Sequence, residues 1–267
     1  MKLSASFALM SDLRAAIGVA TLPTLKAIWL TPSLIIHPAA LSRIFMAAVW
    51  AAFAAPTDEG ARATKRKLIS PHAKGTVLDI GAGLGHSIDY LDRNMVKVYI
   101  ALEPNVLMHA AIRTRAGAAG FKETDRNLLI LQCGAEDTAA IHKKIDGAGL
   151  QVDTMLSIMT FCSIPDAQCT IERLVSDVLA PGGQLLCYEH VLSPRADVAW
   201  WQHFWTPLWR IAFGGCCLNR PTHLWIEALE DKDGKSVWNQ REVWGKDGEP
   251  DEHLFWHRVC RFVKCSN

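Results

Sequence analysis

The eight cysteines of this sequence form neither a metal-binding pattern nor a disulfide framework. They stand at positions 133, 162, 169, 187, 216, 217, 260 and 265, without a CxxC pair and without histidines at zinc-finger spacing. Cys216 and Cys217 are adjacent and cannot form an ordinary disulfide, and several others lie in apolar runs, where a free cysteine behaves as a small hydrophobe. The pattern predicts no metal site, free thiols and a reducing compartment, so we expect a cytoplasmic protein.

A surplus of charge is also absent. The 28 Lys and Arg residues nearly balance the 27 Asp and Glu residues, which leaves +1 at pH 7. Proteins that bind nucleic acid depend on a surplus of basic side chains for much of their affinity, so we expect no nucleic-acid partner. The basic run Lys65-Arg66-Lys67 is short and predicts a solvated helix face. Half of the 267 residues are apolar, which is enough for one large α/β core.

No uncharged segment reaches the roughly 20 residues that a membrane span requires. Charged residues and prolines interrupt the apolar N-terminal segment at Asp12, Arg14, Pro23, Lys26, Pro32, Pro38 and Arg43. The prolines predict short helices, so residues 1–60 form an added helical N-terminal segment ahead of a domain over residues 61–267. Three roles stay open for the segment: a lid packed on the domain, peripheral contact of residues 1–56 with a membrane, or a secretory signal, which the early charges disfavour.

Beyond Gly75, short apolar runs alternate with amphipathic segments. The apolar runs predict strands at residues 76–80, 97–103, 127–133, 152–159 and 184–190. The segments between them predict helices at residues 86–93, 105–115, 135–144 and 167–179. This alternation predicts an α/β fold with a mostly parallel sheet, in which ligands bind at the carboxyl ends of the strands. The polar C-terminal part predicts an antiparallel hairpin.

A glycine-rich turn follows the first predicted strand in the string VLDIGAGLGHS, residues 77–87. Gly81, Gly83 and Gly85 alternate along it and allow backbone NH groups to approach a ligand closely. A dinucleotide-binding fingerprint requires a further glycine at position 86, where this sequence has His86. The spacing therefore disfavours an NAD-dependent oxidoreductase.

This string and four later ones resemble the class I S-adenosylmethionine (SAM) methyltransferases in order and spacing. VLDIGAGLG resembles motif I, ALEPN contains the second acid, and CGAED (133–137) is similar to the residues that border the adenine. VDTMLS (152–157) and LAPGGQLLCYEH (179–190) resemble strands four and five. The resemblance covers residues 75 to 191. It implies a Rossmann-like class I methyltransferase fold, with a mostly parallel seven-stranded sheet and an antiparallel C-terminal hairpin.

The resemblance implies SAM as the cofactor and S-adenosylhomocysteine (SAH) as the product. Glu103 then accepts hydrogen bonds from the two ribose hydroxyls, and Asp79 orients the glycine loop or reaches the methionine amino group through water. The implied cofactor-binding residues are Asp79, Gly81, Ala82, Gly83, Gly85, His86, Glu103, Pro104, Asn105, Gly134, Ala135, Glu136 and Ser157. Two structural alternatives stay open, in which Asp79 caps the following turn and Glu103 caps the helix that begins at Asn105.

A longer string resembles the microsomal methyltransferase-like proteins that methylate small thiols in animals. The string is FCSIPDAQCTIERLVSDVLAPGGQLLCYEHV, and the aromatic segment WWQHFWTPLW and a Gly-Cys-X-Leu segment follow it, as they do in those proteins. Fungal and bacterial relatives of this type act on phenols and other small metabolites, so the resemblance leaves the acceptor atom open.

The acceptor determines whether a base is needed. Methyl transfer from the activated sulfonium requires mainly alignment, but a phenol with a pKa of about 10 loses its proton less readily than a thiol at about 8.5. The candidate bases are His190, with Glu189 to tune its imidazole or bind the acceptor, and His203 on the aromatic helix. Both histidines also have a structural interpretation, as do His253 and His257.

The aromatic segment 199–213 has three possible roles: core, acceptor wall or membrane contact. An aromatic wall suits a small aromatic acceptor. We therefore expect a SAM-dependent methyltransferase that acts on a small lipophilic acceptor, and the leading prediction is O-methylation of a phenolic hydroxyl. The alternatives are S-methylation of a small thiol and a non-catalytic SAM-fold binding protein.

Overall fold

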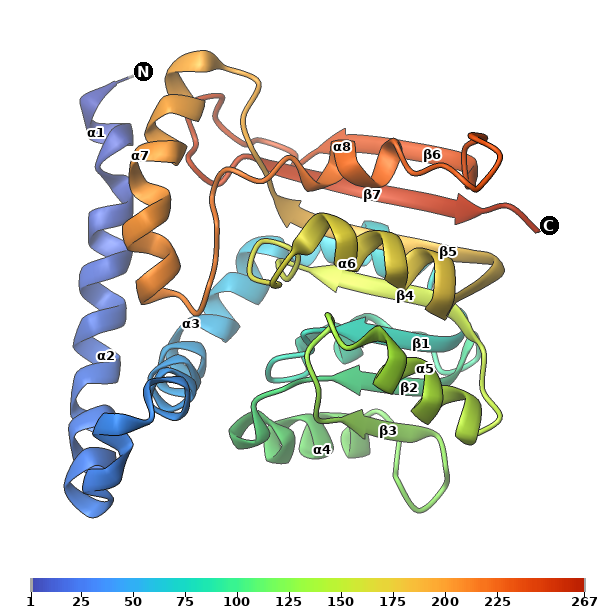
Figure 1. The fold of residues 1–267 in the computed structure, drawn as a ribbon, viewed down its shortest axis with the longest axis horizontal. Helices are drawn as coiled ribbons and strands as arrows, with labels where there is room; N and C mark the ends of the chain where they lie inside the picture. Colours follow the sequence, from blue (N-terminus) through green and yellow to red (C-terminus); the bar gives the residue numbers. More distant parts are fainter. Residues whose placement is uncertain (1, 267) are drawn as a thin grey trace.

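The computed structural model describes residues 2 to 266 and contains a seven-stranded sheet between two layers of helices (Figure 1). The strand order is β3-β2-β1-β4-β5-β7-β6. The strands are β1 (Gly75–Ile80), β2 (Val96–Leu102), β3 (Leu128–Leu131), β4 (Val152–Ile158), β5 (Leu179–His190), β6 (Trp238–Gly245) and β7 (His257–Lys264). Strands β1 to β5 pair in parallel, whereas β7 pairs antiparallel with both β5 and β6. The predicted sheet with its C-terminal hairpin is confirmed.

Two apolar cores lie on opposite faces of the sheet. Leu78 and Ile80 of β1 pack into one core, and Val77 packs into the other, because successive side chains of a strand point to opposite faces. The helices are α1 (Leu3–Ser6), α2 (Ala8–Leu30), η1 (Pro32–Ile36), α3 (Pro38–Ile69), η2 (His86–Tyr90), η3 (Val106–Met108), α4 (His109–Ala118), α5 (Thr138–Gly147), α6 (Ala167–Arg173), η4 (Leu174–Val178), α7 (Ala196–Ala212) and α8 (Thr222–Glu227). Helices α5, α6 and α8 contribute to the first core, and α4 and the end of α3 contribute to the second.

The predicted helix over residues 86–93 is wrong. The chain forms only the short η2 helix there, because Gly85 enters it in a left-handed conformation and Leu91 returns to extended backbone. The end of α3 occupies the layer that a longer helix would fill, since Leu68 and Ile69 pack in the same core as Ile88.

The prediction of short N-terminal helices is also wrong. Pro32 and Pro38 begin helices η1 and α3, at the first position, where the missing proline N–H is not needed. Pro23 lies inside α2 and has no N–H to donate to the carbonyl of Val19, four residues earlier. Val19 is exposed to water. Helix α3 runs without interruption across residue 60, so the division of the chain at that point stays a prediction.

Helices α2 and α3 stand at the carboxyl-end edge of the parallel strands, and α7 lies beside α2 (Figure 1). The ring of Phe7 packs edge-on against Trp201 and Trp205, and the Trp205 indole N–H donates to the Ser6 carbonyl over 2.7 Å. By length and composition alone, α2 and α3 are each long and apolar enough to cross a membrane. In the apolar 18-residue stretch of each helix, 11% is buried.

Candidate active site

A cavity of about 870 Å³ opens at the carboxyl ends of β1, β2, β4 and β5. This volume lies within the range of about 300–1,000 Å³ that small-molecule sites occupy. The glycine loop, Glu103 and the segment 133–136 line one part of the cavity. Apolar side chains from α3, α7 and the segments that follow line the other part: Met46, Val49, Trp50, Phe53, Trp209, Phe213 and Phe255. The site therefore has a polar end and an aromatic end.

The glycine loop is held in left-handed backbone conformations. The φ angles are 65° at Gly81, 57° at Gly83 and 81° at Gly85. A Cβ atom at Gly81 would lie 2.5 Å from the methyl carbon of Thr160, a distance at which the atoms overlap. The group that packs closely against the Gly81 backbone is therefore Thr160 of the chain itself. The space for a ligand lies beyond the glycine loop.

Glu103 connects the glycine loop to the turn after β2. The Gly83 N–H donates to its Oε2 over 2.9 Å, and the Asn105 N–H donates to its Oε1 over 2.8 Å. Each carboxylate oxygen retains a lone pair that can accept from a ligand hydroxyl. Burial raises the pKa of Glu103 to about 7, although both amide donors act to lower it. The side chain is 6% exposed and faces the cavity.

Ten of the predicted cofactor-binding residues line the cavity: Gly81, Ala82, Gly83, His86, Glu103, Pro104, Asn105, Gly134, Ala135 and Glu136. Asp79 lies beneath the loop, where the Tyr99 hydroxyl donates to its Oδ2 over 2.7 Å. Burial raises the pKa of Asp79 to about 6. Gly85 and Ser157 are likewise buried behind the cavity wall. These three positions favour a supporting role over direct contact with a cofactor.

A buried ion pair from α3 lines the cavity and was missed by sequence reasoning. The Lys65 ammonium donates to Asp58 Oδ1 over 2.7 Å, and the Tyr90 hydroxyl donates to Asp58 Oδ2 over 2.9 Å. Burial raises the pKa of Asp58, but these two donors outweigh it and hold the pKa below its usual value. The prediction of a solvated helix face is wrong for Lys65, which is 4% exposed. The seven-residue spacing of the pair, two helical turns, was the available signal.

The candidate bases differ in position. His190 is the last residue of β5, is 3% exposed and lines the cavity. Glu189 points to the opposite side of the strand, where its Oε1 accepts from the Ser157 hydroxyl over 2.7 Å and from the Thr160 N–H over 2.9 Å. His203 is exposed on α7 and bonds the Ala199 carbonyl. The geometry supports neither Glu189 nor His203 as a group that touches the acceptor.

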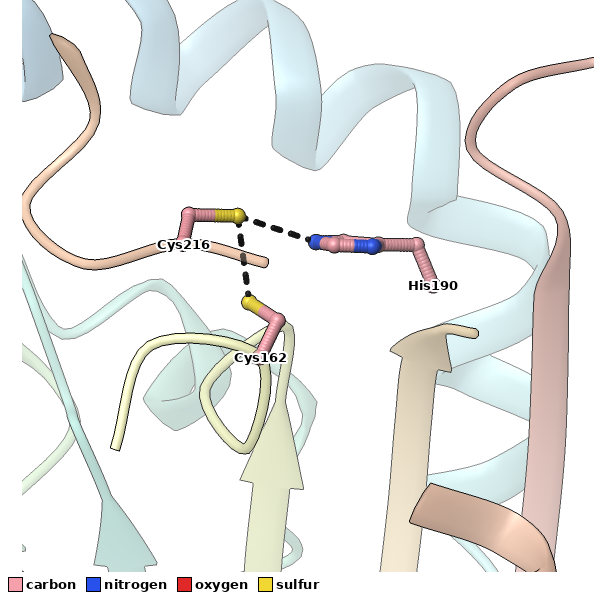
Figure 2. A group of neighbouring side chains, drawn as sticks. All are labelled: Cys162, His190 and Cys216. Atoms are coloured by element: carbon pink, nitrogen blue, oxygen red, sulfur yellow. Dashed lines mark hydrogen bonds between the residues drawn. The ribbon is translucent and has the colours of Figure 1, made fainter. Parts of the chain in front are cut away.

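Cys162, His190 and Cys216 converge at the aromatic end of the cavity (Figure 2). The Nε2 atom of His190 lies 3.2 Å from Cys216 Sγ, and Cys216 Sγ lies 3.5 Å from Cys162 Sγ. A second group joins Glu249 to His253 and His257, and both histidines direct Nδ1 at the same carboxylate oxygen. Sequence spacing could not predict the first group, because its members come from separate loops and strands, whereas Glu249, His253 and His257 lie four residues apart in the β6–β7 loop and at the start of β7.

Comparison with known proteins finds a matching family model and relatives of similar sequence. A family model described as a methyltransferase domain matches residues 52–227. The thiol S-methyltransferase TMT1A of Homo sapiens is 27% identical over 174 residues, which cover 61% of this chain and 65% of the relative. The human thiol S-methyltransferase TMT1B is 35% identical over 72 residues, which cover 27% of this chain and 29% of the relative. The chain thus spans less than two thirds of each of these relatives.

Solved structures share the fold at low sequence identity. An O-methyltransferase family protein from Burkholderia thailandensis is 13% identical, with a TM-score of 0.56 over 85% of this chain and 61% of that protein. The DhpI–SAH complex is 16% identical, with a TM-score of 0.51 over 85% of this chain and 95% of that protein.

Proposed function

Since the chain belongs to the methyltransferase domain family, as a SAM-dependent enzyme of class I, we propose that it transfers the methyl group to the sulfur of a small lipophilic thiol. The observation that carries the proposal is the aromatic end of the cavity, where Cys162, His190 and Cys216 meet apolar side chains. His190 directs Nε2 at a thiol of the chain itself, so it is poorly placed to deprotonate a phenol. The names of the two human relatives support the same acceptor atom.

The proposed mechanism relies on alignment. Glu103 accepts from the ribose hydroxyls, and Lys65 and Asp58 meet the carboxylate and the amino group of the methionine end. The acceptor sulfur attacks the methyl carbon in line with its bond to the sulfonium. The electron pair of that bond returns to the sulfonium sulfur, SAH leaves as a neutral thioether, and the acceptor proton passes to water. A thiol with a pKa of about 8.5 supplies a few per cent of thiolate at neutral pH without a protein base.

A matched panel of acceptors tests the proposal. Pairs that share a carbon skeleton, such as thiophenol with phenol and benzyl mercaptan with benzyl alcohol, are incubated with labelled SAM and the purified chain. We expect each thiol to react at least about tenfold faster than its oxygen partner, because more of it is ionised. O-methylation of a phenolic hydroxyl is the second candidate, favoured by the aromatic lining of the cavity. Faster methylation of phenol than of thiophenol would establish it in place of the thiol.

We also propose that the N-terminal helices close the cavity and touch a membrane surface, so that the cytoplasmic enzyme meets lipophilic acceptors there. Met46, Val49 and Trp50 of α3 line the cavity, which supports the first role. Apolar side chains around the turn between α2 and α3 support the second, since Trp29 is 85% exposed and Ile36 is 76% exposed. A division into residues 1–60 and 61–267 remains part of this proposal.

Vesicle sedimentation checks the membrane contact. We expect the paired change Trp29→Asp and Ile36→Asp to reduce binding of the full chain to phosphatidylcholine vesicles by more than about tenfold, since each side chain removes about 1.5–3 kcal/mol of apolar burial. Met95→Asp is the matched control, because Met95 is also exposed but lies next to the amino end of β2, at the opposite edge of the sheet. Equal sedimentation of all three proteins would contradict the contact.

A further inference from the structure

We propose that Cys162, His190 and Cys216 bind one Zn²⁺ ion and leave its fourth coordination position open to the acceptor. The metal site stands on the geometry of these side chains. Its use in activating an acceptor thiol rests on the function proposed above.

The fold brings the three residues to one point from separate parts of the chain. β4 and β5 are adjacent parallel strands, with Ile158 paired to Tyr188 near their ends, so both carboxyl ends meet at one edge of the sheet. Cys162 follows β4, and His190 is the last residue of β5. Cys216 lies in the segment between α7 and α8 (Figure 2).

Bonds that do not involve the thiols hold the loops together. The Cys217 N–H donates to the Cys162 carbonyl over 2.9 Å. The Arg220 guanidinium donates to the carbonyls of Phe161 over 2.8 Å and Ile164 over 2.7 Å. The backbone on both sides of the two cysteines is therefore fixed before any metal binds, which lowers the ordering cost of coordination.

The spacing fits a tetrahedral zinc ion. Zn–S bonds of about 2.3 Å and Zn–N bonds of about 2.0–2.1 Å require about 3.8 Å between two sulfurs and about 3.6 Å between sulfur and nitrogen. The observed separations are 3.5 Å between the two sulfurs and 3.2 Å between Cys216 Sγ and His190 Nε2. All three ligand atoms lie within 4.8 Å of one another. Movements of a few tenths of an ångström bring these two separations to the tetrahedral values, and the third, between Cys162 Sγ and the His190 ring, is at most 4.8 Å.

The chemistry of the set selects zinc. Two thiolates and one imidazole neutralise the charge of a divalent ion and match its borderline softness. The side chains of Cys162, His190 and Cys216 are 2%, 3% and 8% exposed and face the cavity. Three protein ligands with one open position are typical of catalytic zinc rather than structural zinc.

His190 has the ring nitrogen that a zinc ligand needs. Coordination through Nε2 places the proton on Nδ1, and Nδ1 is buried without a hydrogen-bond partner among residues 2 to 266. Histidines that bind metals usually donate this second N–H to a nearby acceptor or a water, so occupation of the site requires a water or a neighbouring acceptor to reach His190 Nδ1. In the group of Glu249, His253 and His257, both histidines direct Nδ1 at the Glu249 carboxylate, so ion pairing among the three residues already accounts for their convergence.

The metal adds a step to the proposed transfer. The acceptor R–SH takes the open position, its S–H bond breaks, and the proton leaves to water, which gives a zinc-bound thiolate. The thiolate lone pair forms the new bond to the methyl carbon, and the electrons of the broken carbon–sulfur bond pass to SAH. The product R–S–CH₃ is a neutral thioether, a weaker ligand than a thiolate, so it leaves the metal. The sum is R–SH and SAM cation giving R–S–CH₃, SAH and one proton.

Metal analysis of the purified full chain tests the site. After dialysis against zinc and then against metal-free buffer, we expect about one zinc per chain. Cys162→Ser and Cys216→Ser should each reduce the zinc content at least about tenfold. Cys217→Ser is the matched control and should retain the metal, because the Cys217 thiol donates to the Gly215 carbonyl over 3.4 Å and does not belong to the group of Cys162, His190 and Cys216. Zinc-free wild-type protein, or equal zinc in all variants, overturns the site.

A cobalt-substituted chain tests the open position. Co²⁺ bound by two thiolates gives charge-transfer and d–d absorption, and addition of benzyl mercaptan should change both bands, whereas benzyl alcohol should not. If a cysteine variant fails to fold, as judged by its melting temperature, the wild type is treated with 1,10-phenanthroline instead. Its activity should then fall at least about tenfold and return with added Zn²⁺.

The outcomes separate the metal site from the proposed function. Zinc binding at the three residues without methylation of any thiol would overturn the function and leave the site. Thiol methylation at an unchanged rate by the zinc-free chain would overturn the metal's role and leave the function. An intramolecular disulfide between Cys162 and Cys216 in the freshly purified protein, detected as a mass lower by two hydrogen atoms, would also overturn the site.

Discussion

Replacing Glu103 by alanine is expected to weaken SAM binding by at least about 100-fold, because two hydrogen bonds to a charged acceptor contribute about 1.5–3 kcal/mol each. The change also removes the acceptors for the Gly83 and Asn105 N–H groups, so part of the loss comes from a less ordered loop. Titration calorimetry measures the affinity. Glu123→Ala is the control, because Glu123 pairs with Arg113 on the surface. Unchanged SAM affinity in Glu103→Ala would remove Glu103 from the cofactor site.

The pH dependence of the wild type checks the same residue in a different way. Burial raises the pKa of Glu103 to about 7 in the free protein, and hydroxyl donors of the ligand favour the ionised carboxylate. SAM binding therefore releases a proton below this pKa. Affinity should be constant above about pH 7 and should fall by up to about tenfold per pH unit below it. Glu103→Gln, which cannot ionise, should bind weakly with a flat profile. A flat profile in the wild type would contradict this account.

Gly81→Ala is expected to destabilise the fold by about 3 kcal/mol or more and to abolish SAM binding. Two causes combine: a φ angle of 65°, which costs a residue with a Cβ about 1–2 kcal/mol, and overlap of the new Cβ with Thr160, whose methyl carbon lies 2.5 Å away. Thr160 is restrained, because its backbone N–H donates to the buried Glu189 and its hydroxyl donates to the Ile158 carbonyl over 3.3 Å. Thermal unfolding should show a lower melting temperature, at about 2–4 °C per kcal/mol.

A double substitution separates the two causes. Gly81→Ala combined with Thr160→Ala removes the overlapping side-chain atoms and leaves only the backbone strain, so stability and SAM binding should return in part. Gly117→Ala is the control: Gly117 lies inside α4 and has open space around its Cβ position, so the change should be neutral or stabilising by up to about 1 kcal/mol. If Thr160→Ala restores neither stability nor SAM binding, overlap with Thr160 is not the cause of the loss in Gly81→Ala.

The strands, the C-terminal hairpin and the glycine loop could be predicted because each depends on local pattern. Apolar runs of strand length must be buried, and alternate glycines after an apolar run mark a turn with left-handed backbone. The helix after the loop could not be predicted well. The length of this helix is limited by the end of α3, which already packs against Ile88. A local sequence pattern contains no information about that contact.

The long N-terminal helices were mispredicted for a similar reason. A proline signals a break only where the lost hydrogen bond has no replacement, and Pro23 lies on an exposed face of α2. Lys65 was assigned to a solvated face because a basic run usually is solvated, whereas packing of α3 over the cavity buries it beside Asp58.

The resemblance of the ordered motifs to the class I methyltransferases was sufficient to predict that fold and SAM, because each motif is a run of consecutive residues. The meeting of Cys162, His190 and Cys216 depends on tertiary structure, because parallel pairing of β4 and β5 and the bonds from Cys217 and Arg220 bring distant loops to one edge of the sheet. Sequence spacing predicted no metal site. Metal ligands that lie on separate loops have no characteristic spacing in the sequence. Only the folded chain therefore shows that two thiols and an imidazole lie around one point.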